Sequence, residues 1–172
     1  MPANENPVSG NQTPLPTTSP ITAASLAWTE REKREHLFRE HIKTALEHNR
    51  KTLFDKLAAC AITSVTVSFD GYGDSGQIEN VEAKHGDDVI ALPDVRLELW
   101  QADWNNAGIA RRASTIHGAV EELCYALLAQ THCGWENNEG AYGDFTFDVA
   151  GQSITLDYNE RYTESENYTH EF

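Results

Sequence analysis

Two glycine-rich, acidic segments carry the residue types that could do chemistry. The first is FDGYGDSGQIE at residues 69–79, and the second is THCGWENNEGAYGDFTFD at residues 131–148. Carboxylate and amide oxygens are the hard ligands that Ca²⁺, Mg²⁺ or Mn²⁺ accepts in proteins. The candidate metal ligands are Asp70, Asp74, Glu79, Glu136 and Asp144, to which His132 could add one nitrogen.

A plain turn is the alternative interpretation of both segments. Glycines supply positive φ angles in long turns, and Asp and Asn side chains bond to their own backbone there. The first segment also lacks the twelve-residue spacing of a calcium-binding loop. The sequence leaves the metal site and the plain turn open.

Aromatic side chains stand among these acidic residues. Aromatic residues dominate the energetics of protein interfaces, so this pattern is typical of a protein-binding rim. Trp135 fits a second interpretation equally well, as a hydrophobic plug over the end of the preceding helix. The candidate interaction residues are Tyr72, Trp135, Glu136, Asn137, Asn138, Glu139 and Tyr142.

No catalytic residue can be assigned from spacing. Cys133 follows His132, but adjacent side chains rarely face each other and no third orienting group is evident. Ser75 lies in GDSGQ, which echoes the nucleophile region of chymotrypsin-like proteases without their His and Asp context. The sequence therefore favours a protein that is not an enzyme.

The net charge of −14 is concentrated in the second part of the chain. Residues 61–172 carry 5 Lys and Arg against 20 Asp and Glu. Such a surface disfavours direct DNA binding and favours cations or a partner with a basic surface. The absence of a signal-peptide pattern and of a long apolar run predicts a cytoplasmic protein without a membrane segment.

The chain is predicted to have four parts. Residues 1–26 hold five of the six prolines and read as a disordered tail. Residues 27–61 predict an amphipathic helix, with Thr29 and Glu32 as a capping box. The remaining parts are a domain over residues 62–160 and an acidic tail over 161–172.

The domain is predicted to be α+β. Val65, Val67 and Phe69 alternate with polar residues, which indicates a half-buried strand. A second helix is expected over residues 114–133 and a hairpin turning at Gly151 after it, while residues 94–104 fit either strand or helix. These amphipathic runs are satisfied by two layers, a mostly antiparallel sheet packed against helices.

The motifs GYGDSGQIE and GWENNEGAYGDFTFD, followed by ITLDYNE, resemble an uncharacterised bacterial family. That family is a domain of unknown function carried on plasmids and integrative mobile elements, and the similarity covers roughly residues 50–172. The resemblance implies a bacterial setting and implies that the two loops belong together. It supplies no activity.

The leading functional hypothesis is an accessory protein of a mobile element that binds another protein through the two loops. A role in defence or counter-defence is compatible with this hypothesis. The alternative is a divalent-metal-dependent hydrolase or nuclease with its carboxylates in the two loops.

Overall fold

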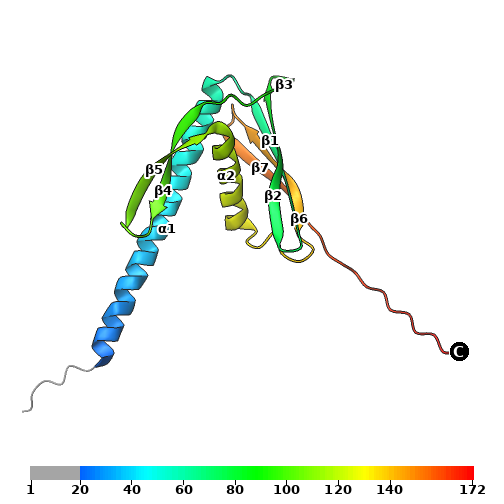
Figure 1. Cartoon of the computed structure of the whole chain (residues 1–172), viewed down its shortest axis with the longest axis horizontal. Helices are drawn as coiled ribbons and strands as arrows, with labels where there is room; N and C mark the ends of the chain where they lie inside the picture. The colour runs from blue at the N-terminus through cyan, green and yellow to red at the C-terminus, as the bar shows by residue number, and fades with distance from the viewer. Residues whose placement is uncertain (1–19) are drawn as a thin grey trace, which may run out of the picture. The chain divides into compact units, whose positions relative to one another are not determined.

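Figure 1 shows the computed structural model of the chain, which describes the backbone of residues 20–172 and the side chains of residues 29–172. The chain divides into two units, residues 1–36 and 37–172. The described part of the first unit is the N-terminal portion of a helix, and the second unit holds all the strands.

Helix α1 spans Pro20–Ala59 and begins before the helix predicted for residues 27–61. Proline suits a first helical position, where its missing amide would have had no partner. Thr29, predicted as the cap, therefore lies inside the helix. The rest of the predicted tail, residues 1–19, is outside the described residues.

In the second unit α1 buries one stripe of its surface. Ala45, Leu53 and Leu57 are at most 5% exposed, as the helical spacing predicts. Phe54 is also buried, at 1% exposed, and its ring lies 6.1 Å from that of Phe147. Burial of such side chains is the main force that holds α1 on the sheet.

The main sheet has five antiparallel strands in the order β3-β2-β1-β6-β7. Strand β1 lies at its centre and pairs with both β2 and β6. The strands are β1 Ser64–Tyr72, β2 Ser75–His85, β3 Asp88–Ile90, β6 Ala141–Asp148 and β7 Ser153–Glu160.

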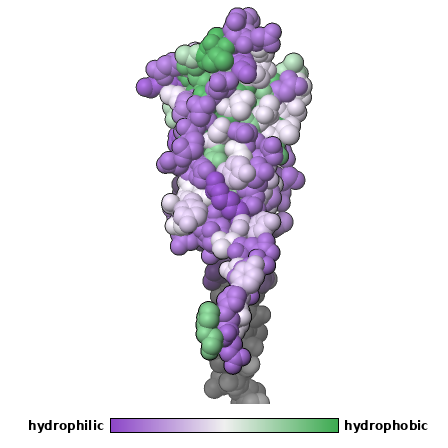
Figure 2. Space-filling view, turned by 90° about the vertical axis from the view of Figure 1, so that its right-hand side faces the viewer, coloured by the Kyte–Doolittle hydropathy of each residue, from purple (hydrophilic) through white to green (hydrophobic). Residues whose placement is uncertain are grey.

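The two faces of the sheet differ in chemistry. On the inner face Val65 lies opposite Phe147 and Val67 opposite Phe145, and all four are at most 1% exposed. They belong to one core with side chains of both helices, so the predicted alternation is confirmed. The outer face carries Ser, Thr and carboxylate side chains, and the side of the molecule turned to the viewer in Figure 2 is mostly hydrophilic.

Helix α2, Ile116–Thr131, lies within the range 114–133 expected for the second helix and is capped by Thr115. The Thr115 hydroxyl accepts a hydrogen bond from the Gly118 amide at 3.1 Å, which satisfies one free donor of the first turn. The helix buries Val120, Leu128 and Cys124, and burial raises the pKa of the Cys124 thiol to about 12. Cys124 is therefore a protonated core residue.

A separate two-stranded hairpin, β4 Arg96–Asp103 and β5 Gly108–Thr115, precedes α2. Residues 94–104, left open between strand and helix, are thus mostly strand, with Leu97 and Leu99 turned into the core. Strand β5 was not predicted, because GIARRAST has no apolar alternation to mark it.

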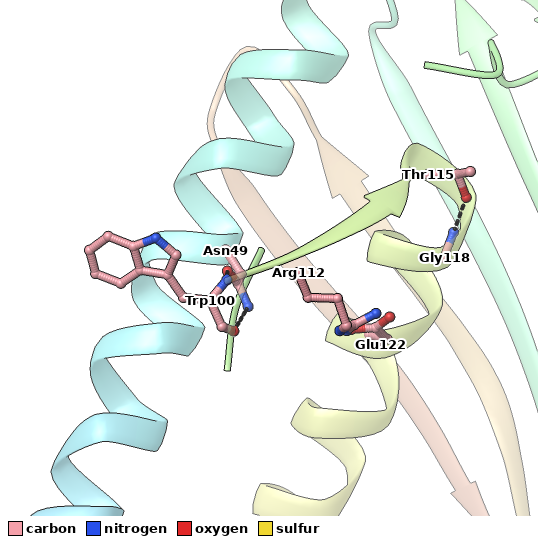
Figure 3. Close-up of polar contacts among 6 residues, drawn as sticks. All are labelled: Asn49, Trp100, Arg112, Thr115, Gly118 and Glu122. Atoms are coloured by element: carbon pink, nitrogen blue, oxygen red, sulfur yellow. Dashed lines mark hydrogen bonds and ion pairs between the residues drawn. The ribbon is translucent and has the colours of Figure 1, made fainter. Parts of the chain in front are cut away.

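Side-chain hydrogen bonds fix this hairpin to both helices (Figure 3). The Asn49 amide accepts from the Trp100 backbone N–H at 2.7 Å and donates to its C=O at 2.9 Å, as a neighbouring strand would. The His48 ring stacks on the Trp100 indole with centroids 3.7 Å apart. On the other side Arg112 forms an ion pair with Glu122 of α2.

The predicted fold class, a mostly antiparallel sheet packed against helices, is confirmed. Among the described residues, neither helix combines the length and apolar character needed to cross a membrane.

Asn49→Ala should destabilise the protein by about 1–3 kcal/mol, because two backbone groups of Trp100 lose their partner in a half-buried position. Urea unfolding followed by circular dichroism measures the change. Asn159→Ala, an exposed position on β7, is the matched control and should change stability by less than about 0.5 kcal/mol. Equal effects of the two substitutions would show that the Asn49 bonds do not hold the hairpin.

Candidate functional site

The strand order brings the two acidic loops to one end of the sheet. The β1–β2 turn and the loop of residues 132–140, which leads into β6, are joined there because β1 lies between β2 and β6. The Gly73 amide donates to the Asn138 carbonyl at 3.0 Å, and the Asp74 amide to the Glu136 carbonyl at 3.2 Å. We call residues 70–76, which contain the β1–β2 turn, and residues 132–144 together the loop edge. The two loops thus lie together, as the family resemblance implied.

Trp135 lies beneath the loop edge as part of the core. It is 9% exposed, and its ring meets that of Phe69 edge-on with centroids 5.3 Å apart. The expectation of an exposed binding aromatic at this position is thus corrected: Trp135 is a buried plug, and its ring packs on Phe69 and the facing β1–β2 turn. A large apolar side chain flanked by two glycines of the facing turn is better placed against them than in water.

Gly71 and Gly76, the first and last glycines of GYGDSG, make room for this indole. A Cβ atom on Gly71 would lie 2.7 Å from the Trp135 ring, and one on Gly76 would overlap it. Gly140 has φ +70°, and a Cβ there would run into the carbonyl of Gly71. The glycines are therefore required by close packing between the two loops, a reason that neither segment reveals alone.

Arg161 ties the end of β7 to the loop edge. Its guanidinium binds both carboxylate oxygens of Asp70, at 2.7 and 3.2 Å, and donates to the Gly71 carbonyl at 2.9 Å. It also lies 4.6 Å above the Tyr142 ring. The hydrogen bonds to Asp70 raise the pKa of Arg161 above its usual value. Arg161 was not predicted as a site residue, because 91 residues separate it from Asp70.

The candidate metal ligands are placed apart from one another or are already bonded. Asp70 is held by Arg161, Asp144 accepts from the Ser68 hydroxyl at 2.6 Å, and Glu79 accepts from Gln77 at 2.9 Å. Asp74 faces the Asn138 amide at 3.4 Å. Across residues 29–172 no three His, Cys, Asp or Glu side chains are grouped so as to hold a metal ion. The geometry gives the metal-dependent hydrolase no support.

The His132 ring is also engaged. It stacks on the Tyr158 ring with centroids 3.6 Å apart, while Cys133 next to it is exposed. Burial, followed by the negative charges of Glu160 and Glu136, raises the pKa of the Tyr158 hydroxyl. A polar cleft of about 330 Å³ lies between residues 134–140 and 158–163.

The exposed aromatic residues of the loop edge are the two tyrosines. Tyr72 is 64% exposed and Tyr142 is 44% exposed. In register, Tyr142 lies directly opposite Asp70, two residues along β1 from Tyr72, so all three side chains belong to the outer face. Asn137 and Asn138 are exposed nearby, whereas Glu136 and Glu139 are half-buried.

Two carboxylates face each other next to these tyrosines. Asp144 of β6 and Asp157 of β7 are direct partners in the antiparallel register. In the described part of the chain neither forms a salt bridge. Like charges directly opposite each other destabilise a sheet. The hydrogen bond from the Ser68 hydroxyl stabilises the charge of Asp144 alone and brings no cation to the pair.

Residues 45–172 match the model of a family of unknown function, DUF6878, and the chain belongs to that family. The match includes both loops and the whole main sheet. No curated protein and no solved structure matches the chain. The mobile-element setting that the resemblance implied stays a prediction.

Because Trp135 fills the space between Phe69, Gly71 and Gly76, Trp135→Ala should destabilise the protein by about 3–5 kcal/mol, as Phe147→Ala should. Thermal or urea unfolding gives the comparison. Glu136→Gln, the neighbouring half-buried position, is the control and should stay within about 0.5 kcal/mol of the wild type. A stable Trp135→Ala protein would contradict the plug.

Arg161→Lys should lower the unfolding midpoint, because an ammonium group cannot keep the paired hydrogen bonds to Asp70 and the contact with Tyr142 at once. Asp70→Asn should cause a similar loss, and the double variant should lose little more than either single one. Additive losses in this cycle would mean that the two side chains act independently.

Proposed function

We propose that this member of a family of unknown function is a protein-binding module. It docks on a basic surface of another protein through the loop end of the outer sheet face. The observation that carries the proposal is the position of two exposed tyrosines, Tyr72 and Tyr142, beside the opposed carboxylates Asp144 and Asp157.

The tyrosines have the properties of interface anchors. Tyrosine contributes a large rigid surface with one polar end, and such residues dominate binding energy at protein interfaces. Tyr142 is held from one side by the Arg161 guanidinium, so little conformational freedom is lost when a partner covers it. Both rings are available, since neither belongs to the core.

The carboxylates determine the class of partner. Asp144 and Asp157 repel each other in the free protein, and a Lys or Arg of a partner would relieve that repulsion. Asp148 lies four residues from Asp144 on the same exposed face of β6. Arg161 at the same end of the sheet is already bound to Asp70. Negative potential on this face would attract a basic protein and repel nucleic acid.

A nucleic-acid-handling protein is a fitting example of such a partner, because a face of regularly spaced carboxylates presents charge as phosphates do. The exposed amides of Asn137 and Asn138 extend this surface along the loop edge. Glu136 and Glu139, half-buried beside them, add negative charge without taking part in the core.

The test is capture of partners from a cell extract by the immobilised full chain, with quantitative mass spectrometry. Tyr72→Ala combined with Tyr142→Ala should remove the captured proteins, and Asp157→Lys should do the same. Asp87→Lys, in the exposed β2–β3 turn, makes the same change of net charge at a distant place and should leave capture intact.

Binding should weaken as salt is raised, and the captured proteins should be basic. Asp157→Asn should keep the fold or stabilise it by up to about 1 kcal/mol, since it removes the repulsion from Asp144. Equal loss of capture in Asp87→Lys and Asp157→Lys would reduce the effect to general charge and would contradict a site on this face.

A further inference from the structure

An apolar groove lies between α1 and α2 beside strand β4, and it shares no residue with the loop edge. Its volume is about 530 Å³. Ile42 within it is 47% exposed, although it belongs to the apolar stripe of α1. Its apolar walls include Phe38, Ile42, Leu46, Leu99, Leu123 and Ala126. An apolar groove that is open to water is a candidate docking place for an apolar side chain of suitable size.

Two cations of α1 directly follow groove residues in the chain, Arg39 after Phe38 and Lys43 after Ile42. Arg39 and Lys43 are exposed, and among the described residues neither forms an ion pair. Lys43 and Arg50 line an adjoining cleft of about 350 Å³ that shares Leu46 and Leu123 with the groove. Glu47 lines the same cleft, and Glu122 lines the groove and is paired with Arg112. Lys43 and Arg50 therefore outnumber the one carboxylate without an ion pair, and the rim is basic on balance in a chain with a net charge of −14. An acidic segment with large apolar side chains would complement it.

The residues after Arg161 have that composition. We call residues 162–172 the arm. Every residue of the arm is exposed, and it forms no helix or strand. Tyr162, Tyr168 and Phe172 are 83%, 68% and 116% exposed, and the arm carries Glu164, Glu166 and Glu171.

The contacts found for the two distal aromatic rings stay within the arm. Tyr168 hydrogen-bonds to Glu166, and the His170 and Phe172 rings lie 6.3 Å apart. The family match extends through residue 172, so the arm belongs to the domain that the family shares. A shared segment with exposed aromatic side chains is better explained by a docking site than by a solvated tail.

The exit of the arm favours the groove of another copy. The Arg161 side chain is fixed at the loop edge by Asp70 and Gly71, and the chain beyond β7 runs away from the sheet (Figure 1). The groove instead lies between the two helices, which pack on the inner face. An extended arm of this length spans about 36 Å, enough to reach a neighbouring molecule.

We propose that two copies of this chain exchange arms, so that the arm of each docks in the groove of the other. Tyr168 and Phe172 enter the apolar part of the groove, and the arm glutamates lie beside Arg39 and Lys43. The arrangement is closed and two-fold, since every copy offers one arm and one groove. Arg161 holds the base of the arm and reduces the freedom lost on docking.

Sedimentation equilibrium of the full chain over a wide concentration range tests the exchange. We expect a reversible dimer. Tyr168→Ser with Phe172→Ser, or Ile42→Glu alone, should weaken association at least about tenfold. Thr169→Ala with His170→Ala changes the same arm without removing those two rings and should have little effect. Circular dichroism melting checks that each variant is folded, which is expected because these side chains are exposed.

Reversing the charges distinguishes docking of the arm of another copy from docking of the arm of the same molecule. A chain with Lys43→Glu and a chain with Glu164→Lys and Glu166→Lys should each dimerise weakly. Mixing the two chains should restore a heterodimer. A chain that is monomeric at every concentration would overturn the proposal, as would a dimer that none of these variants weakens. A third chain carries Lys43→Glu, Glu164→Lys and Glu166→Lys together. If this chain stays monomeric while its arm is bound, the arm occupies the groove of its own molecule, which would also overturn the exchange.

Discussion

The burial of Trp135 is the interaction on which the loop edge depends. Its indole fills the space between the Phe69 ring and the glycines at positions 71 and 76. A turn built from glycines loses much conformational entropy on folding, and burial of the indole offsets part of that cost. The backbone bonds from Gly73 and Asp74 to the facing loop add to this stabilisation.

The two sides of the loop edge have different roles. The inner side is committed to the core through Trp135 and Phe69, so it cannot also bind a ligand. The outer side keeps the tyrosines, the carboxylates and Arg161, whose two-point bond to Asp70 fixes the start of the arm. A binding surface supported by a rigid core loses less entropy when a partner docks.

The charge distribution follows a similar division. Carboxylates gather on the outer sheet face, while unpaired cations remain on α1 beside the apolar groove. Separate regions of opposite charge on one small domain permit two different contacts, one with a basic partner and one with an acidic segment. The opposed pair Asp144 and Asp157 shows that the sheet carries charge that its own stability does not require.

The sequence by itself determined the elements whose apolar period is unbroken. The alternation at Val65, Val67 and Phe69 and the cap at Thr115 are local signals, because side-chain direction and capping depend on near neighbours. The early start of α1 and the presence of β5 escaped prediction, since neither has such a signal. The attachment of the β4–β5 hairpin to α1 was not predicted either, because it depends on a contact between Asn49 and Trp100, which are 51 residues apart.

Tertiary structure alone decided what the loop residues do. Pairing of β1 with β6 could be proposed, but the sequence left Trp135 open between an exposed anchor and a plug. Trp135 is buried because the glycines of the opposite loop have no Cβ atom and leave room for the indole. Arg161 lies beside Asp70 because β7 pairs with β6 and β6 pairs with β1. Contacts between residues so distant in sequence depend on which strands pair, and local sequence patterns do not predict them.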